Sequence, residues 1–347
     1  MVWKSITAAG AAFLFGSLTA LYAAGPPIGS GVVSTMPIAS SPVALDASDP
    51  SVDRIGRLAS LGTHVLTSSN RQFGGISAML WFEGCNRLLA ASDTGVWVIL
   101  EPNETDGRLV GVRDAWIAPI LGLDGRPPGS KSEADAESLS RAANGDIWVF
   151  YEQRHRGMRF EGIDACRPET LATAPVAEWV LGDTGTWPGN GGIESSAMQG
   201  ETLLMITEDV PGSKTGRLGL AGGPSGVQRF SYANPEGHQP TAMDPLDPGH
   251  DNGRMLLLHR SWSPLRGASA IFAEAQIDAD PAELVEPKVI ARFRPPVLVD
   301  NMEALAVRAE GERRFVYLMS DDNFNPLQRT VLMKFELLPE EKQPEGG

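Results

Sequence analysis

One hairpin pattern recurs five times along the chain, and this repeat constrains the fold more than any other feature of the sequence. Each copy has a short apolar run, a turn that contains glycine and a strongly hydrophobic run, which is the pattern of two antiparallel strands. Successive turn glycines lie 61, 55, 53 and 58 positions apart, at Gly84, Gly145, Gly200, Gly253 and Gly311. A near-regular period of this length indicates a series of equivalent structural units.

The segments around these turns predict the kind of unit. Asn144-Gly145 and Asn252-Gly253 are dipeptides that suit a type I′ hairpin turn. Further strand-like segments follow each hairpin, such as residues 96–100 and 330–337. Four strands in about 40–60 residues are typical of a β-propeller blade. We therefore predict an all-β propeller of four-stranded antiparallel sheets with little helix, and the turn count leaves five or six blades open.

The two ends of the repeat region indicate how the ring closes. The residues before the first turn glycine and those after the last one together make one further period. We therefore expect residues 55–68 to supply the outer strand of the last blade, and we place the propeller domain at residues 54–338. A pair of β-sandwiches would give no reason for a period of this kind.

Composition and charge exclude several other classes of protein. The chain has 38 glycines and 26 prolines, which are too many for a helical bundle, and 42% hydrophobic residues, which are enough for a large core. Its 43 acidic and 29 basic residues give a net charge of −14 without a cluster of Lys or Arg. Nucleic acid is therefore not an expected partner, because binding to phosphates depends on clustered cations. We expect a monomer.

The N-terminus predicts export. Residues 1–24 have a single cation at Lys4 and then an uncharged run, which is the pattern of a secretory signal peptide. An uncleaved membrane anchor is the alternative, and the protein would contact a membrane only in that case. Residues 25–53 are rich in Pro, Ser and Gly and are expected to form an extended leader, and residues 339–347 a disordered tail.

Cys85 and Cys166 are the two cysteines of the chain. An exported protein favours a disulfide between them. Two separate buried thiols are the alternative, and the sequence leaves both open.

Polar residues recur at equivalent positions of the repeat. Alignment of the first strands places together Ser77, Glu137, Glu194, Thr241 and Glu303. If the first strand of each blade is innermost, the glutamates converge on one mouth of the central channel. Carboxylates so close repel one another unless a proton or a cation neutralises them, and Ca²⁺ takes six to eight oxygen ligands. We predict a Ca²⁺ site whose ligands are Glu137, Glu194, Glu303 and Asp300. The alternative is that these acids only cap backbone amides or pair with Arg.

The ends of the second strands are also polar, and they supply the other candidates. They carry Asp93, Glu152, Glu208, His259, Arg260, Asp321 and Asp322. The chain has no G-x-S-x-G or H-E-x-x-H motif, and its five histidines are scattered. A serine hydrolase and a zinc hydrolase are therefore disfavoured, and no organic cofactor is expected.

Several short motifs resemble a known family. They are G-G-I-S at residues 74–77, D-x-E at 135–137, N-x-G-x-E at 190–194, D-N-x-E-x-L at 300–305 and the long block S-D-D-N-F-N-P-L-Q-R-T at 320–330. The combination resembles the phytase-like family of exported bacterial proteins, described as having the esterase-like activity of phytase, over roughly residues 54–338. The resemblance implies a propeller, a periplasmic or secreted location in a Gram-negative bacterium, and hydrolysis of phosphate or carboxylate esters. The chain lacks the D-D-P-A motif of β-propeller phytases.

Together these observations predict an exported, Ca²⁺-assisted ester hydrolase that acts on a small anionic ester, with a phosphoester preferred. The expected catalytic residues are Asp321, Asp322, Asn323, Arg260 and His259. The expected substrate-binding residues are Asp93, Asn190, Asn301 and Arg260. A lactonase-like or carboxylesterase propeller and a non-catalytic periplasmic binding or scaffold propeller are the alternatives.

Overall fold

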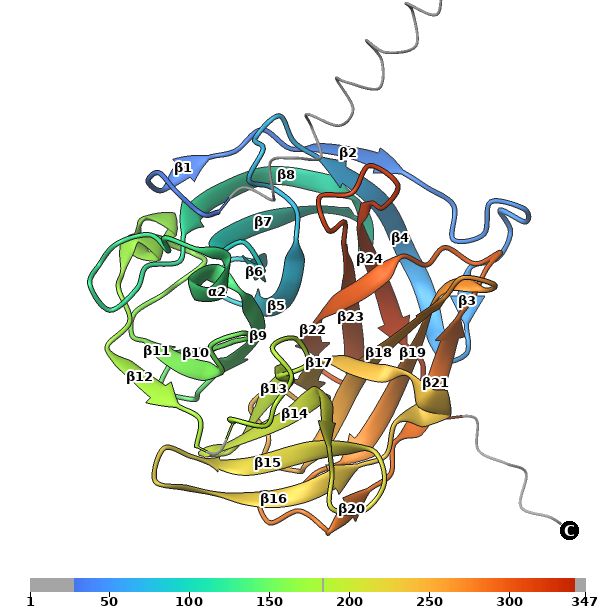
Figure 1. The fold of residues 1–347 in the computed structure, drawn as a ribbon. Coiled ribbons are helices and arrows are strands. Elements are labelled where there is room, and N and C mark those ends of the chain that lie inside the picture. The colour runs from blue at the N-terminus through green and yellow to red at the C-terminus, as the bar shows by residue number, and fades with distance from the viewer. Residues whose placement is uncertain (1–27, 183, 341–347) are drawn as a thin grey trace, which may run out of the picture.

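Five antiparallel sheets stand around a central axis in the computed structural model, which describes residues 28–182 and 184–340 (Figure 1). The chain is a five-bladed β-propeller, so the all-β prediction is confirmed and the choice between five and six blades is settled. No helix in these two ranges is long and apolar enough to cross a membrane. The predicted signal segment, residues 1–24, lies outside the described residues.

The blades follow one another along the chain. The first blade has β5 (Ile76–Phe82), β6 (Arg87–Ser92), β7 (Val96–Thr105) and β8 (Arg108–Pro119), with β1 (Ser34–Thr35) at its outer edge. The second blade has β9 (Ala136–Arg141), β10 (Ile147–Tyr151), β11 (Arg156–Phe160) and β12 (Ala177–Val180). The third blade has β13 (Ile193–Gln199), β14 (Thr202–Pro211), β15 (Arg217–Gly223) and β16 (Gly226–Tyr232), and β20 (Leu284–Val285) runs parallel to β16.

The fourth blade has β17 (Gln239–Pro245), β18 (Arg254–Ser263), β19 (Gly267–Gln276) and β21 (Lys288–Phe293). The fifth blade has β22 (Asn301–Glu310), β23 (Arg313–Asp321), β24 (Thr330–Leu337), β4 (Leu58–Thr67) and β2 (Ala39–Pro42), and β3 (Arg54–Ile55) pairs with β4. The described helices are short, namely α2 (Lys131–Ala134) and the 3₁₀ turns η1 (Pro168–Ala172) and η2 (Pro235–Gly237).

The fifth blade closes the ring with strands from both ends of the chain. β4 pairs with β24 in an antiparallel register that includes Val331 opposite Val65, as expected for the outer strand of the last blade. The predicted leader, from residue 28 onward, runs along the outside of the propeller, where β1 pairs with β8 and β2 pairs with β4 (Figure 1). In the predicted tail, Glu340 forms ion pairs with Lys288 and Arg57, and residues 341–347 lie outside the described residues.

In each Asn-Gly turn only the glycine is left-handed, because neither Asn144 nor Asn252 has a positive φ, so the predicted type I′ turns do not form. Gly145 has φ of 93° and Gly253 has φ of 70°. A Cβ on Gly253 would lie 2.3 Å from the side-chain nitrogen of Gln276, so that side chain would have to move. In the first hairpin the left-handed residue is Asn86, with φ of 54°, rather than Gly84.

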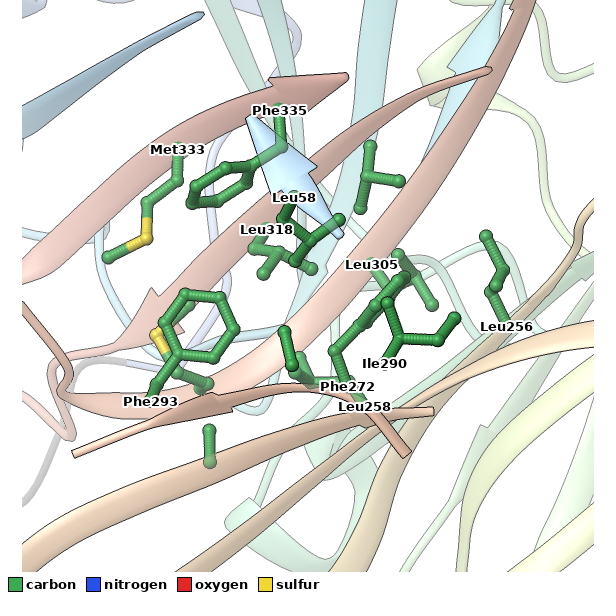
Figure 2. Packing of buried hydrophobic residues seen from close by; sticks show 14 of the residues in the cluster. Leu58, Leu256, Leu258, Phe272, Ile290, Phe293, Leu305, Leu318, Met333 and Phe335 are labelled. Carbon is green, nitrogen blue, oxygen red and sulfur yellow. The ribbon is translucent and has the colours of Figure 1, made fainter. Parts of the chain in front are cut away.

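Apolar side chains fill the space between adjacent blades. Figure 2 shows the cluster between the fourth and fifth blades, where Leu258 and Phe272 pack with Leu305, Leu318 and Phe335. These side chains are at most 1% exposed, because each blade buries both of its faces against its neighbours. This packing fixes the angle between blades and therefore the positions of the innermost strands.

A disulfide joins Cys85 and Cys166, with a Cα–Cα distance of 5.5 Å. Cys85 lies in the turn between β5 and β6, and Cys166 lies in the loop after β11. The bond therefore connects the first blade to the second, and the alternative of two separate thiols is excluded.

Candidate functional site

Each innermost strand has a β-bulge at the same position, near one mouth of the channel. In β5, for example, Ile76 pairs with Ser92 and Ala78 pairs with Ala91, so Ser77 has no partner on β6. The same shift leaves one residue unpaired in β9, β13, β17 and β22. We call the five unpaired residues the bulge ring; they are Ser77, Glu137, Glu194, Thr241 and Glu303. A bulge bends its strand and re-aims a side chain, and bulges are common beside functional sites.

A second ring surrounds the first. The second strand of each blade ends at the same mouth, and the residues there are Asp93, Glu152, Glu208, Arg260 and Asp321. Side chains of both rings line a cavity of about 340 Å³. We call it the acidic cavity, because eight carboxyl side chains and two basic side chains of the described residues line it. None of its described lining side chains is aliphatic or aromatic.

Two hydroxyls of the bulge ring bind neighbouring blades. Ser77 donates a hydrogen bond to the carbonyl of Ala136 at 2.6 Å, and Thr241 donates one to the carbonyl of Met302 at 3.0 Å. Both acceptors come immediately before a bulge glutamate in the next blade. These hydroxyls therefore help to hold Glu137 and Glu303 in place.

Lys131 on α2 occupies one side of the cavity. Its Nζ lies 2.6 Å from Asp93 Oδ2 and 2.5 Å from Asp135 Oδ1, and Gln153 donates to the other Asp135 oxygen at 2.6 Å. The two carboxylates raise the pKa of Lys131, although burial opposes them. The ammonium is therefore charged at neutral pH.

Arg260 occupies the side formed by the third, fourth and fifth blades. Its Nη2 lies 2.9 Å from Glu208 Oε1 and its Nε lies 2.8 Å from Glu303 Oε1. Asn301 donates a further hydrogen bond to Glu303 Oε1 at 2.8 Å. The guanidinium thus joins one carboxylate of each ring.

The remaining acids are concentrated between these two cations. Asp135, Glu137 and Glu152 each have a carboxylate oxygen within 4.8 Å of the others. Glu152 accepts hydrogen bonds from the backbone N–H groups of Gly191 and Gly192, and its carboxyl group interacts with that of Glu194. Such a group of oxygens can hold a divalent cation.

Burial and mutual repulsion act on these acids together. Burial, followed by the charges of neighbouring acids, raises the pKa values of Glu137 and Glu194 well above the usual range. Burial likewise raises the pKa of Asp321, with Asp93 and Glu303 adding to the effect. Burial raises the pKa of Glu303 to about 7, although Arg260 lowers it. The cavity therefore favours either protons or a bound cation.

Two fully buried carboxylate oxygens of the lining residues, Glu303 Oε2 and Asp93 Oδ1, lack a hydrogen bond from any described residue. Arg260 Nε, although 2.8 Å from Glu303 Oε1, also lacks a hydrogen bond of good geometry to a described residue. The Glu303 side chain is 6% exposed. A buried polar atom without a partner costs free energy, so this wall of the cavity is held at a cost to stability.

Most of the site residues predicted from the sequence meet in this cavity. Its lining includes Glu137, Glu194, Glu303, Asp93, Asn190, Asn301, Arg260, Asp321 and Asn323. The backbone N–H of Asn323 donates to Asp321 Oδ1 at 2.6 Å, which fixes that carboxyl group.

Three predicted site residues lie elsewhere. His259 is fully buried behind the cavity wall, where its Nε2 lies 2.8 Å from the Tyr232 hydroxyl, and burial lowers its pKa to about 3. Asp322 accepts hydrogen bonds from the backbone of Gly75 and Phe324. Asp300 pairs with Arg329 at 3.3 Å. Their contacts are those of structural residues.

Sequence reasoning did not select Lys131 or Gln153. Lys131 precedes Asp135 by four positions, a spacing that places both on one side of a helical turn, but α2 lies between blades and outside the repeat. The sequence did contain a signal for three further lining residues. Asp135 begins the D-x-E motif, and Glu152 and Glu208 lie at the ends of second strands. All three line the acidic cavity.

A comparison with models of known protein families finds a match. The family model described as "Phytase-like: Esterase-like activity of phytase" matches residues 71–324. No curated protein sequence matches the chain.

Solved structures similar to the chain are distant. The major Malassezia sympodialis allergen Mala s 1 is 12% identical, with 90% of this chain and 99% of the allergen covered and a TM-score of 0.40. A putative gluconolactonase is 10% identical, with 91% and 96% covered and a TM-score of 0.40. Likeness at this level carries no argument about activity.

Proposed function

The chain belongs to the phytase-like family, and we propose that its acidic cavity hydrolyses an ester with the help of a bound divalent cation. The observation that carries this proposal is the bulge ring, which brings three glutamates from three blades to one channel mouth. A propeller needs no such cluster for its stability, and buried like charges oppose folding.

The donor set fits a hard cation. The clustered ligand atoms of Asp135, Glu137 and Glu152 are all carboxylate oxygens, and the carboxyl group of Glu194 interacts with that of Glu152. Ca²⁺ prefers six to eight oxygen ligands. We propose that Glu137, Glu152 and Glu194 hold Ca²⁺ and that Asp135, already paired with Lys131, supports them.

A bound cation would neutralise the carboxylates and polarise the ester oxygen. The side chains of the cavity have separate roles. Asp321, fixed by the Asn323 N–H, is placed to accept and return a proton, and burial raises its pKa above that of an ordinary aspartate. Arg260 and Asn301 hold Glu303 and orient the substrate from the opposite side.

Export remains part of the proposal. The Cys85–Cys166 disulfide supports it, because such bonds form in oxidising compartments such as the bacterial periplasm.

The test is hydrolysis by wild type and by two matched variants. We expect wild-type turnover to disappear with a chelator and return with Ca²⁺. Glu194→Gln should lower the apparent Ca²⁺ affinity at least about tenfold. Glu201→Gln, an exposed change in the turn of the same hairpin, should behave as wild type.

A folded Glu194→Gln protein with full activity would contradict the metal assignment. A wild-type protein that binds no cation and hydrolyses no phosphoester, carboxyl ester or lactone would instead favour a binding or scaffold propeller.

A further inference from the structure

The polarity of the acidic cavity restricts the kind of ester that can enter it. We infer that the substrate is a small ester that carries no negative charge and several hydrogen-bond donors, and that phosphate esters are excluded. This inference rests on the proposed function and names its substrate class.

The first argument is the balance of charge. Both cations of the lining are already bound between two carboxylates: Lys131 by Asp93 and Asp135, and Arg260 by Glu208 and Glu303. The three protons of Lys131 face the Asp93 carbonyl, Asp93 Oδ2 and Asp135 Oδ1, so a phosphate would have to displace one of these acceptors, whereas Arg260 keeps Nη1 free of the described residues but is already neutralised by two carboxylates. Eight acids face two bases, so even with one divalent cation bound and half of the acids protonated, the lining would carry no net positive charge. Like charges repel a partner as strongly as opposite charges attract one.

The second argument is the balance of hydrogen bonds. Carboxylates only accept hydrogen bonds when ionised, and they dominate the lining. A ligand that brings hydroxyl or amine donors would satisfy these acceptors, whereas an anion would add more acceptors.

The third argument is size. A cavity of about 340 Å³ is at the small end of ligand sites. Because none of the described lining side chains is apolar, a long acyl chain would find no complementary surface. A polyhydroxylated ester of a short acid fits both limits, and an inositol polyphosphate does not fit the charge.

The experiment compares substrates that share an acetyl group but differ in charge, with Ca²⁺-loaded full-length protein. They are glycerol monoacetate, which is neutral and rich in donors, acetoxyacetate, which is anionic, and acetylcholine, which is cationic. We expect kcat/KM for glycerol monoacetate to exceed that for acetoxyacetate by about 100-fold, a difference of about 2.7 kcal/mol. Added salt should raise kcat/KM for acetoxyacetate and lower it for acetylcholine, because screening weakens both interactions.

A matched pair of variants tests the electrostatic cause. Glu208→Gln removes one lining charge and releases Arg260 Nη2, so its preference for glycerol monoacetate over acetoxyacetate should fall about tenfold. Glu201→Gln, which is exposed and outside the cavity, should leave the ratio unchanged.

Binding gives a readout that does not need turnover. We expect glycerol 3-phosphate to bind the Ca²⁺-loaded protein with a Kd no tighter than about 1 mM. Tighter binding, or hydrolysis of the phosphate or of acetoxyacetate at least as fast as glycerol monoacetate, would overturn the inference and leave the ester hydrolase standing. If no ester is hydrolysed, the proposed function fails, and the binding result alone decides whether the cavity excludes anions.

Discussion

The buried glutamates of the bulge ring oppose folding, because their carboxyl groups are desolvated and repel one another. Glu194 is 6% exposed and faces the charges of Glu137, Glu208, Glu152 and Glu303, which together with burial raise its pKa. Without a cation, each of these carboxyl groups must be protonated or repelled. Natural sites commonly give up stability in this way for function.

Glu194→Gln should therefore stabilise the metal-free protein. Removing one ionisable group from the cluster is expected to raise the free energy of unfolding by about 1–2 kcal/mol at pH 8. Urea unfolding in the presence of a chelator measures this, with Glu201→Gln as the control. A lower stability for Glu194→Gln would mean that the carboxylate is held by favourable contacts even without metal.

Asp244, at the opposite end of the channel, gives a prediction about pH. Burial raises its pKa to about 8 from an ordinary value of 3.8, although a hydrogen bond from the Val307 N–H lowers it. The folded state therefore keeps a proton that the unfolded state releases. The stability linked to this group is fully present below pH 3.8 and is lost as the pH rises through 8.

Asp244→Asn should remove this dependence and keep the bond to Val307, because the amide oxygen can also accept it. Between pH 5 and pH 8, wild type should lose about 2–4 kcal/mol relative to the variant. Urea unfolding at the two pH values gives the comparison. Equal pH dependence of the two proteins would show that Asp244 is not protonated in the fold.

At the scale of elements, the disulfide holds the first blade to the second by a covalent bond. It spans 81 positions of the chain, and closing a loop of that length in the unfolded state is worth about 4 kcal/mol in the chain-entropy model. The double variant Cys85→Ala, Cys166→Ala should lose most of this free energy of unfolding. Wild type unfolded in a reductant should show the same loss, and a difference below about 1 kcal/mol would contradict the account.

The elements also show how far sequence reasoning reaches. The spacing of the turn glycines predicts the blades because four of the five glycines take the left-handed backbone of a hairpin turn, and alignment of the first strands finds the bulge positions. It is harder to predict which residue at the end of a second strand faces the cavity. Adjacent residues on a strand point to opposite faces, so only one of His259 and Arg260 can face the cavity. The sequence does not reveal that Arg260 does.

Lys131 marks the limit of repeat-based prediction. It lies on α2 between two blades, where no equivalent position exists in the other repeats. Its contacts with Asp93 and Asp135 join two blades across the channel mouth and depend on tertiary structure. Asp300, just before β22, pairs with Arg329, and this contact likewise depends on tertiary structure.

For the whole molecule, ring closure and the acidic cavity depend on one another. β4 completes the fifth blade beside β24, and the closed ring brings the bulges of β5 and β22 to the same mouth. The acids converge only in the complete propeller. A cation held there contacts several blades and should stabilise all of them together.

The most direct test of this account is calorimetric titration of Ca²⁺ into the metal-stripped wild-type protein and into Glu194→Gln. The account predicts saturable binding by wild type, a higher Tm when Ca²⁺ is present, and weakened binding by the variant. A folded wild-type protein that releases no heat of binding and has the same Tm with Ca²⁺ and with chelator would contradict the central claim.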